Sequence, residues 1–138
     1  MPKKKSESTV VAKQKKIKIL LVEDDAFLAG MYVTKLTIEG FDVVLASDGE
    51  QGLAQFKKER PDIILLDIVL PKMSGFEVLK AIKEDAAGKD AKVILLTNLG
   101  QREDVTRGLE LGANDYLIKA HFMPSEVVDK IKKIVGGS

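Results

Sequence analysis

The chain has 138 residues, with 22 Lys and Arg against 21 Asp and Glu, one His and no Cys. This length suits one domain with a sizeable core and leaves no room for a second folded domain. The formal charge of +1 gives no general affinity for nucleic acids or membranes, so neither is expected as a partner, and the lack of Cys excludes disulfides and Cys-ligated zinc.

Residues 1–16 are basic, with lysines gathered at 3–5 and 13–16. They contain no apolar run of signal-peptide length, and no later stretch approaches the roughly 18 to 20 apolar residues of a membrane span. We interpret residues 1–16 as a flexible tail, 17–135 as the folded domain and 136–138 as a short C-terminal tail. We expect a soluble, cytoplasmic protein.

Five apolar runs of strand length follow one another along the chain. They are Ile19–Val22, Val43–Leu45, Ile63–Leu66, Val93–Leu96 and Tyr116–Ile118. Three of the runs are apolar at every position, which is typical of central strands in a parallel sheet that is covered on both faces. The runs therefore predict an open parallel sheet and disfavour a sandwich or a barrel, in which apolar and polar residues would alternate.

Segments with apolar residues three and four positions apart separate the runs and follow the last one. They predict helices at 27–39, 50–58, 76–83, 103–111 and 125–135. Gly40 and Gly112 follow two of these helices, where a left-handed residue is favoured, and Pro124 introduces the last. The pattern is (βα)5, an α/β fold with no internal repeat.

Polar side chains directly follow four of the five predicted strands. They are Glu23, Asp24 and Asp25 after the first strand, Asp67 after the third, Thr97 after the fourth and Lys119 after the fifth. Ligands bind beyond the carboxyl ends of parallel strands, so we expect these groups to meet at one edge of the sheet. Each alone could be a helix cap, a strand residue or a surface charge, but their joint occurrence favours a functional site.

These groups suit phosphate chemistry on a metal ion. Converging carboxylates repel one another, and a hard divalent cation such as Mg²⁺ or Mn²⁺ relieves that repulsion. Lys119 supplies a compact positive charge and Thr97 a hydroxyl donor, which together can hold two oxygens of a phosphoryl group. A remaining carboxylate can act as the nucleophile.

Over 17–135 the chain resembles the receiver domains of bacterial two-component response regulators. The motifs match in order: Glu23 and Asp24 correspond to the acidic pair of the family, Asp67 to its phosphorylated aspartate, Thr97 to its hydroxyl residue and Lys119 to its lysine. Pro71 and Gly75 lie four and eight residues after Asp67, as in the family. The resemblance thus covers the whole predicted domain.

The resemblance implies a flavodoxin-like fold, a three-layer sandwich whose five-stranded parallel sheet has the order 2-1-3-4-5. This order would bring Asp24 and Asp67 to one Mg²⁺ ion, with the Val69 carbonyl as a further ligand. Glu23 would act through water, and Asp25 would cap the first helix. Asp67 would then accept a phosphoryl group from a sensor histidine kinase or a histidine phosphotransfer protein.

The resemblance also implies a switch. The phosphate would draw Thr97 toward it, and Tyr116 corresponds to the aromatic residue that turns inward when this hydroxyl moves. The face formed by 103–111, the last strand and the last helix would then change for an unknown downstream protein. Such a chain is not an enzyme in the usual sense, but a phosphoacceptor that catalyses its own phosphotransfer and slow autodephosphorylation.

Two features depart from the family pattern. Ala120 follows Lys119 where the family usually has a proline in a cis peptide bond, so this loop is either trans with a different shape or cis and strained. Val69 and Leu99 are apolar where water would approach the acyl phosphate, which predicts slow self-hydrolysis.

We interpret His121, the only histidine, as a loop residue because no partner ligand accompanies it.

Three other functions fit parts of the pattern. An aspartate-nucleophile phosphatase would also use Mg²⁺, but it needs an Asp-x-Asp motif that 23–27 does not supply. A flavin-binding protein with this fold would need a phosphate loop rich in Ser, Thr and Gly where this chain has acids. An interaction module that never takes phosphate is disfavoured by the complete set of acids, threonine and lysine.

Overall fold

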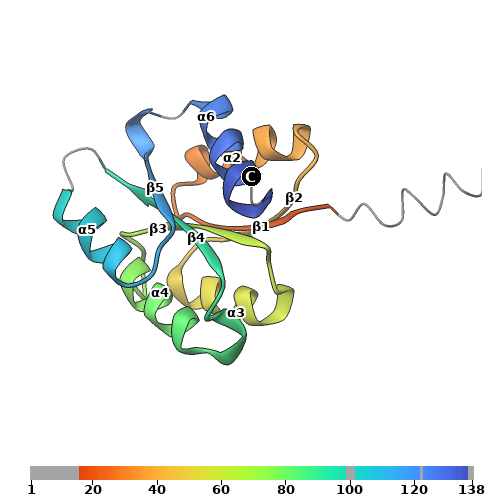
Figure 1. The fold of residues 1–138 in the computed structure, drawn as a ribbon. Coiled ribbons are helices and arrows are strands. Elements are labelled where there is room, and N and C mark those ends of the chain that lie inside the picture. The colour runs from red at the N-terminus through yellow and green to blue at the C-terminus, as the bar shows by residue number, and fades with distance from the viewer. Residues whose placement is uncertain (1–15, 99–101, 122, 137–138) are drawn as a thin grey trace, which may run out of the picture.

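A five-stranded parallel sheet in the order β2-β1-β3-β4-β5 forms the centre of the protein (Figure 1). The computed structural model describes residues 16–98, 102–121 and 123–136. The strands are β1 (Lys18–Val22), β2 (Asp42–Ala46), β3 (Ile63–Asp67), β4 (Lys92–Thr97) and β5 (Asp115–Ile118). This order confirms the predicted flavodoxin-like fold.

Helices cover both faces of the sheet and complete three layers (Figure 1). The helices are α2 (Ala26–Ile38), α3 (Gly49–Glu59), α4 (Gly75–Glu84), α5 (Arg102–Glu110) and α6 (Pro124–Gly136), with two 3-10 helices, η1 (Ala86–Gly88) and η2 (Lys119–His121). Helices α2 and α6 lie on one face, and α3, α4 and α5 lie on the other. The helix and strand bounds agree with the predicted ones to within one residue, but the two 3-10 helices were not predicted.

Two hydrophobic cores explain why the central strands are apolar throughout. Alternate residues of one strand point to opposite faces, so that Ile19 and Leu21 pack under α2 and α6 while Leu20 and Val22 pack under α3 and α4. β3 and β4 divide in the same way. A sheet with two buried faces needs apolar side chains in both sets, and a one-residue slip would exchange the sets.

Polar side chains and glycines fix the helix ends. Asp25 accepts a hydrogen bond from the Leu28 N–H at 3.1 Å and caps α2, as expected. Gly40 and Gly112 have φ values of 96° and 112°, which confirms their predicted left-handed conformation.

None of the helices described is long and apolar enough to cross a bilayer.

The glycine that begins α4 marks a close approach of backbone to backbone. A Cβ atom built at Gly75 would collide with the carbonyl oxygen of Asp67. Gly30, in the middle of α2, is the opposite case, because no described atom apart from its chain neighbours and the backbone of α2 itself lies within 4 Å of a Cβ built there. One glycine is required by packing inside the chain, and the other is not.

We therefore predict opposite effects of the same substitution at these two positions. Gly75→Ala should lower the free energy of unfolding by about 2 kcal/mol or more, because rigid backbone has to move. Gly30→Ala should raise it by about 0.5 to 1 kcal/mol, because alanine is the better helix former. Denaturant unfolding of both variants measures this, and a stabilised Gly75→Ala or a destabilised Gly30→Ala would contradict the packing.

Candidate functional site

Three carboxylates meet at the carboxyl edge of the sheet, where β1 and β3 lie side by side. Val22 pairs with Leu66 in the sheet, so the residues that follow β1 come next to Asp67 at the end of β3. Carboxylate oxygens of Glu23, Asp24 and Asp67 lie within 4.8 Å of one another. The structure thus brings together the three acids that the sequence placed at one site.

The three acids differ in their exposure to solvent. Glu23 and Asp67 are only 1% and 2% exposed, whereas Asp24 lies at the surface. The Glu23 Oε2 atom accepts a hydrogen bond from the Asp25 N–H at 2.9 Å, and Asp67 Oδ1 accepts one from the Val69 N–H at 3.2 Å. The backbone of the two loops therefore orients the buried carboxylates, and the exposed one gives access from solvent.

Lys119 reaches these acids from the end of β5. Its Nζ lies 3.0 Å from Asp67 Oδ2 and 3.2 Å from Glu23 Oε1. β4 separates β5 from β3 in the sheet, so the lysine needs its long side chain to reach across that strand. One ammonium group therefore contacts both buried carboxylates.

Burial and charge shift the pKa values of all three groups. Burial raises the pKa of Glu23 to about 7, although the hydrogen bond from the Asp25 N–H and the charge of Lys119 oppose the rise. Burial also raises the pKa of Asp67, against the hydrogen bond from Lys119. Burial alone would lower the pKa of Lys119, but its hydrogen bond to Asp67 and the charges of Asp67 and Glu23 raise it overall.

The donor set fits a hard divalent cation. Three carboxylates face a single lysine, so ionised acids leave the site with excess negative charge. Glu23 Oε1 is buried and accepts no hydrogen bond from the described part of the chain, so its ion pair with Lys119, which Lys119 shares with Asp67, is the contact that compensates its charge. Oxygen ligands with uncompensated negative charge suit Mg²⁺, Mn²⁺ or Ca²⁺ and do not suit soft metals. The predicted metal site thus has the required chemistry.

Thr97 and Tyr116 lie on the two strands beyond Asp67. Asp67 pairs with Leu96, which places Thr97 one residue further toward the carboxyl edge on β4. The Thr97 side chain is buried, and its hydroxyl makes a long hydrogen bond of 3.4 Å to the Asn98 carbonyl. Tyr116, on β5, is 38% exposed. The threonine therefore lies on the strand next to Asp67, one residue closer to the carboxyl edge, and the tyrosine is partly exposed to solvent.

The loop between β3 and α4 is held by contacts that the sequence analysis missed. The Gly75 N–H donates to the Ile68 carbonyl at 2.8 Å, and the Gly49 N–H donates to the Pro71 carbonyl at 3.2 Å. Lys72 has a left-handed φ of 71° and lies 3.8 Å from Asp48. Asp48 and Gly49 read in sequence as an ordinary helix start, and nothing in the pattern indicates that they also hold this loop.

The loop that follows β5 contains Ala120, for which the sequence left open whether the preceding peptide bond is cis or trans. The Lys119–Ala120 peptide bond is trans, and the chain continues as the short helix η2. Of the two apolar residues expected beside the site, Val69 is 64% exposed, and Leu99 lies outside the described residues. His121, interpreted from the sequence as a loop residue, is the last residue of the 3-10 helix η2.

Comparisons with known proteins agree with this geometry. A probable transcriptional regulator ycf27 of Guillardia theta is 42% identical over 87% of this chain and 46% of its own. The chain spans about half the length of such relatives. A putative response regulator from Chloroflexus aurantiacus has a crystal structure that aligns with a TM-score of 0.84 and 34% identity, over 88% of this chain and 99% of its own.

A second solved structure bears on the metal. The receiver domain of the sensor histidine kinase PA1611 from Pseudomonas aeruginosa aligns with a TM-score of 0.81 and 30% identity, over 88% of this chain and 99% of its own. That structure has a magnesium ion coordinated in its active site cleft. Residues 19–132 match the family described as the response regulator receiver domain. The chain therefore belongs to the receiver domain family of response regulators.

Proposed function

We propose that Asp67 is the phosphoacceptor of this receiver domain, and that it takes its phosphoryl group from a sensor histidine kinase or a histidine phosphotransfer protein. The observation that carries the proposal is the contact of 3.0 Å between Lys119 Nζ and Asp67 Oδ2, inside a cluster of three carboxylates. A nucleophilic carboxylate, a fixed cation and a set of metal ligands are what phosphoryl transfer needs at one point.

The proposed metal ligands are Glu23, acting through water, Asp24, Asp67 and the carbonyl of Val69. The ion would be Mg²⁺ or Mn²⁺, which the charge and the oxygen donors of the site favour. When bound, such an ion neutralises charge on the transferring phosphoryl oxygens. The magnesium ion of the Pseudomonas receiver domain supports this assignment.

In the proposed reaction, a carboxylate oxygen of Asp67 bonds to phosphorus while the bond from phosphorus to the donor imidazole nitrogen breaks. The electron pair of that bond stays with the imidazole. Lys119, already in contact with Asp67, stabilises negative charge on the transferred group, and the Thr97 hydroxyl donates to another of its oxygens. The product is an acyl phosphate, which water later hydrolyses.

The proposed switch uses Thr97 and Tyr116. The long hydrogen bond of the Thr97 hydroxyl to the neighbouring Asn98 carbonyl is weak, so a phosphate oxygen can compete for this donor. Movement of Thr97 would open space for the partly exposed Tyr116 side chain to turn inward. The face formed by α5, β5 and α6 would change with it, and an unknown downstream protein would read that change.

The proposal assigns residues 17–135 to the receiver domain and residues 1–16 and 136–138 to tails. It places the protein in the cytoplasm, where a histidine kinase has access to ATP. The chain acts on itself only: it catalyses its own phosphotransfer and its own slow dephosphorylation.

We predict that acetyl phosphate and Mg²⁺ together add one phosphoryl group to the protein, as measured by intact-protein mass spectrometry. The gain should disappear in Asp67→Asn, which keeps the shape of the side chain but lacks the nucleophilic oxygen, and it should disappear when EDTA removes the metal. Modification of Asp67→Asn to the same extent would refute the assignment of Asp67. No modification by acetyl phosphate, together with no binding of beryllofluoride, would favour a docking module that never takes phosphate.

We also predict a slow loss of the phosphoryl group, because the exposed apolar side chain of Val69 hinders and does not orient an attacking water. Val69→Asn should shorten the half-life of the phosphorylated protein by roughly three- to tenfold, since an amide can hydrogen-bond the water. Val69→Leu, which stays apolar, is the matched control and should leave the half-life nearly unchanged. Equal half-lives for the Asn and Leu variants would disprove this role of Val69.

A further inference from the structure

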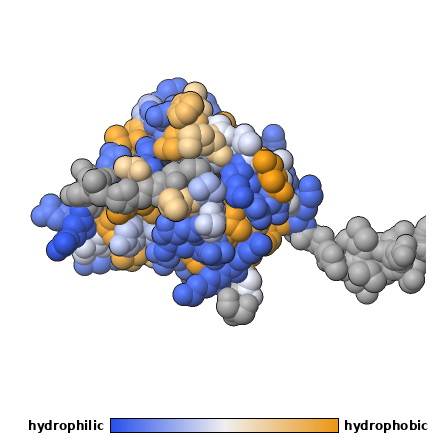
Figure 2. Space-filling model, turned by 90° about the horizontal axis from the view of Figure 1, so that it is seen from above, coloured by the Kyte–Doolittle hydropathy of each residue, from blue (hydrophilic) through white to orange (hydrophobic). Residues whose placement is uncertain are grey.

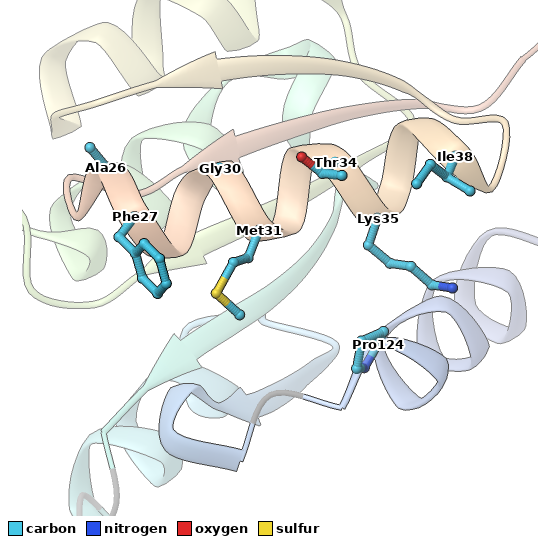
Figure 3. Close-up of a pocket in the computed structure, with 8 residues that line it drawn as sticks. All are labelled: Ala26, Phe27, Gly30, Met31, Thr34, Lys35, Ile38 and Pro124. Carbon is cyan, nitrogen blue, oxygen red and sulfur yellow. The ribbon is translucent and has the colours of Figure 1, made fainter.

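An apolar groove of about 600 Å³ runs along the outer side of α2 and reaches the start of α6 (Figure 3). Its lining includes Phe27, Gly30, Met31, Thr34, Ile38 and Pro124. Phe27 and Ile38 are 79% and 72% exposed, more than any other large apolar side chain described. The view from above, onto the side of the molecule that carries α2 and α6, shows hydrophobic residues exposed among hydrophilic ones (Figure 2). The groove is therefore an apolar surface that the described part of the chain leaves uncovered.

The chain enters the sheet beside one end of this groove. The Ile17 carbonyl, just before β1, accepts a hydrogen bond from the Asp42 N–H at 2.9 Å, and Asp42 follows Ile38, the last residue of α2, by four residues. The side chain of Ile17 packs against the core beneath α2 and α6. In Figure 3, the red strand β1 begins at the same end of α2 as Ile38. The segment before β1 therefore joins the domain near the Ile38 end of the groove.

This segment is long enough to lie along the whole groove. An α-helix rises about 1.5 Å per residue, so the 13 residues of α2 extend over about 20 Å. A fully extended chain covers at most about 3.5 Å per residue, so the chain from Lys16 back to Val10 spans up to about 20 Å and that back to Lys5 nearly twice as much. Val10 can thus reach the groove, and Lys5 can reach beyond its far end.

The residue types of the segment match the groove and its surroundings. Residues 10–12, two valines and an alanine, form an apolar run between the lysines at 3–5 and those at 13–16. Three acids are exposed at the far end of the groove, where α2 and α6 begin: Asp24, Asp25 and Glu126. Moving away from β1, the segment offers first an apolar run and then a cluster of lysines. Moving along α2 from Ile38, the surface offers first the apolar groove and then these acids.

We propose that this groove binds the N-terminal segment of its own chain, with residues 10–12 on the apolar lining and the lysines at 3–5 beside the acids at the far end. The tether favours this occupant over a second copy of the chain, because a segment joined to the domain by a few residues has an effective concentration of the order of millimolar. A weak apolar contact is sufficient at that concentration. The docked segment is an intramolecular cover, which any other ligand of this surface has to displace. The inference does not depend on phosphoryl transfer.

The test places a nitroxide label on the segment and measures which face of the domain it approaches. The chain has no Cys, so Thr9→Cys gives a single attachment site next to the apolar run. In the nitrogen-15 protein, the amide signals of Met31 and Thr34 in α2 should lose at least half of their intensity, relative to the same sample after chemical reduction of the nitroxide. The signal of Ala54, exposed on α3 at the opposite face of the sheet, should keep nearly all of its intensity.

Two double variants of the labelled protein separate docking from tethering alone, since a tethered label broadens nearby signals even without docking. Val10→Asp with Val11→Asp places charge on the side chains that the groove should hold, and the remaining intensity of the α2 signals should rise at least 1.5-fold, by analogy with the cost of burying an unpaired charge. Ser6→Asp with Ser8→Asp adds the same charge to the same segment and keeps the apolar run. This matched control should lose as much intensity as the labelled parent.

Each other outcome would overturn the proposal. Equal losses in α2 and α3, or no recovery in Val10→Asp with Val11→Asp, would show that the apolar run does not lie in the groove. Equal recovery in Ser6→Asp with Ser8→Asp would show that charge alone holds the segment. A mixture of label-free nitrogen-15 protein with nitroxide-labelled protein of natural isotope content should show no loss, and a loss in α2 there would assign the groove to the segment of a second copy.

Discussion

Three carboxylates are gathered beside Lys119 at the carboxyl edge of the sheet. Glu23 and Asp67 are buried, and burial favours the uncharged form of each carboxyl group, so the pKa of each is raised. Lys119 contacts both and compensates only part of their charge. Repulsion between these carboxylates lowers the free energy of unfolding. A cation, or a phosphoryl group together with its metal ion, raises the free energy of unfolding again when it binds to the folded protein. The site is thus held ready for ligands of the charge that phosphoryl transfer requires.

The sheet makes this arrangement possible. Its strands are held by packing on both faces, and its carboxyl edge gives solvent access to the acids. Apolar strands packed on both faces fix the ends of β1 and β3 next to each other, and the acids follow as the first residues beyond the strands. The loop after β3 is tied down by Gly75 and, from α3, by Gly49. The outer side of α2 carries an apolar groove, and α2 begins two residues after Asp24.

Much of this could be predicted from the sequence, because it follows from local rules. Runs that are apolar at every position predict doubly covered strands, and the residue after each strand predicts what reaches the carboxyl edge, which is how Glu23, Asp67 and Lys119 were found. The strand order came from resemblance to a family and not from periodicity. Contacts between distant segments leave no local signal in the sequence. Gly49 looks like the start of a helix, and nothing near it indicates that its N–H binds the Pro71 carbonyl. The peptide bond after Lys119 could have been cis or trans, and only the structure shows that it is trans. The sequence alone does not indicate that Gly30 has open space at the position of its missing Cβ, because that space depends on the packing of other segments.

In the proposed function, the acids of this edge form one metal site, whose charge is balanced when the ion binds. Calorimetric titration of Mg²⁺ into the protein, in buffers of different ionisation enthalpy, tests it most directly. With the pKa of Glu23 at about 7 in the free protein, binding at pH 7 should release on the order of half a proton, more at pH 6 and close to none at pH 8.5, so the affinity for Mg²⁺ should rise with pH and then level off. Glu23→Gln should remove most of this release. Absence of Mg²⁺ binding, or binding whose proton release is the same in Glu23→Gln, would contradict a metal site in which Glu23 loses its proton when the ion binds.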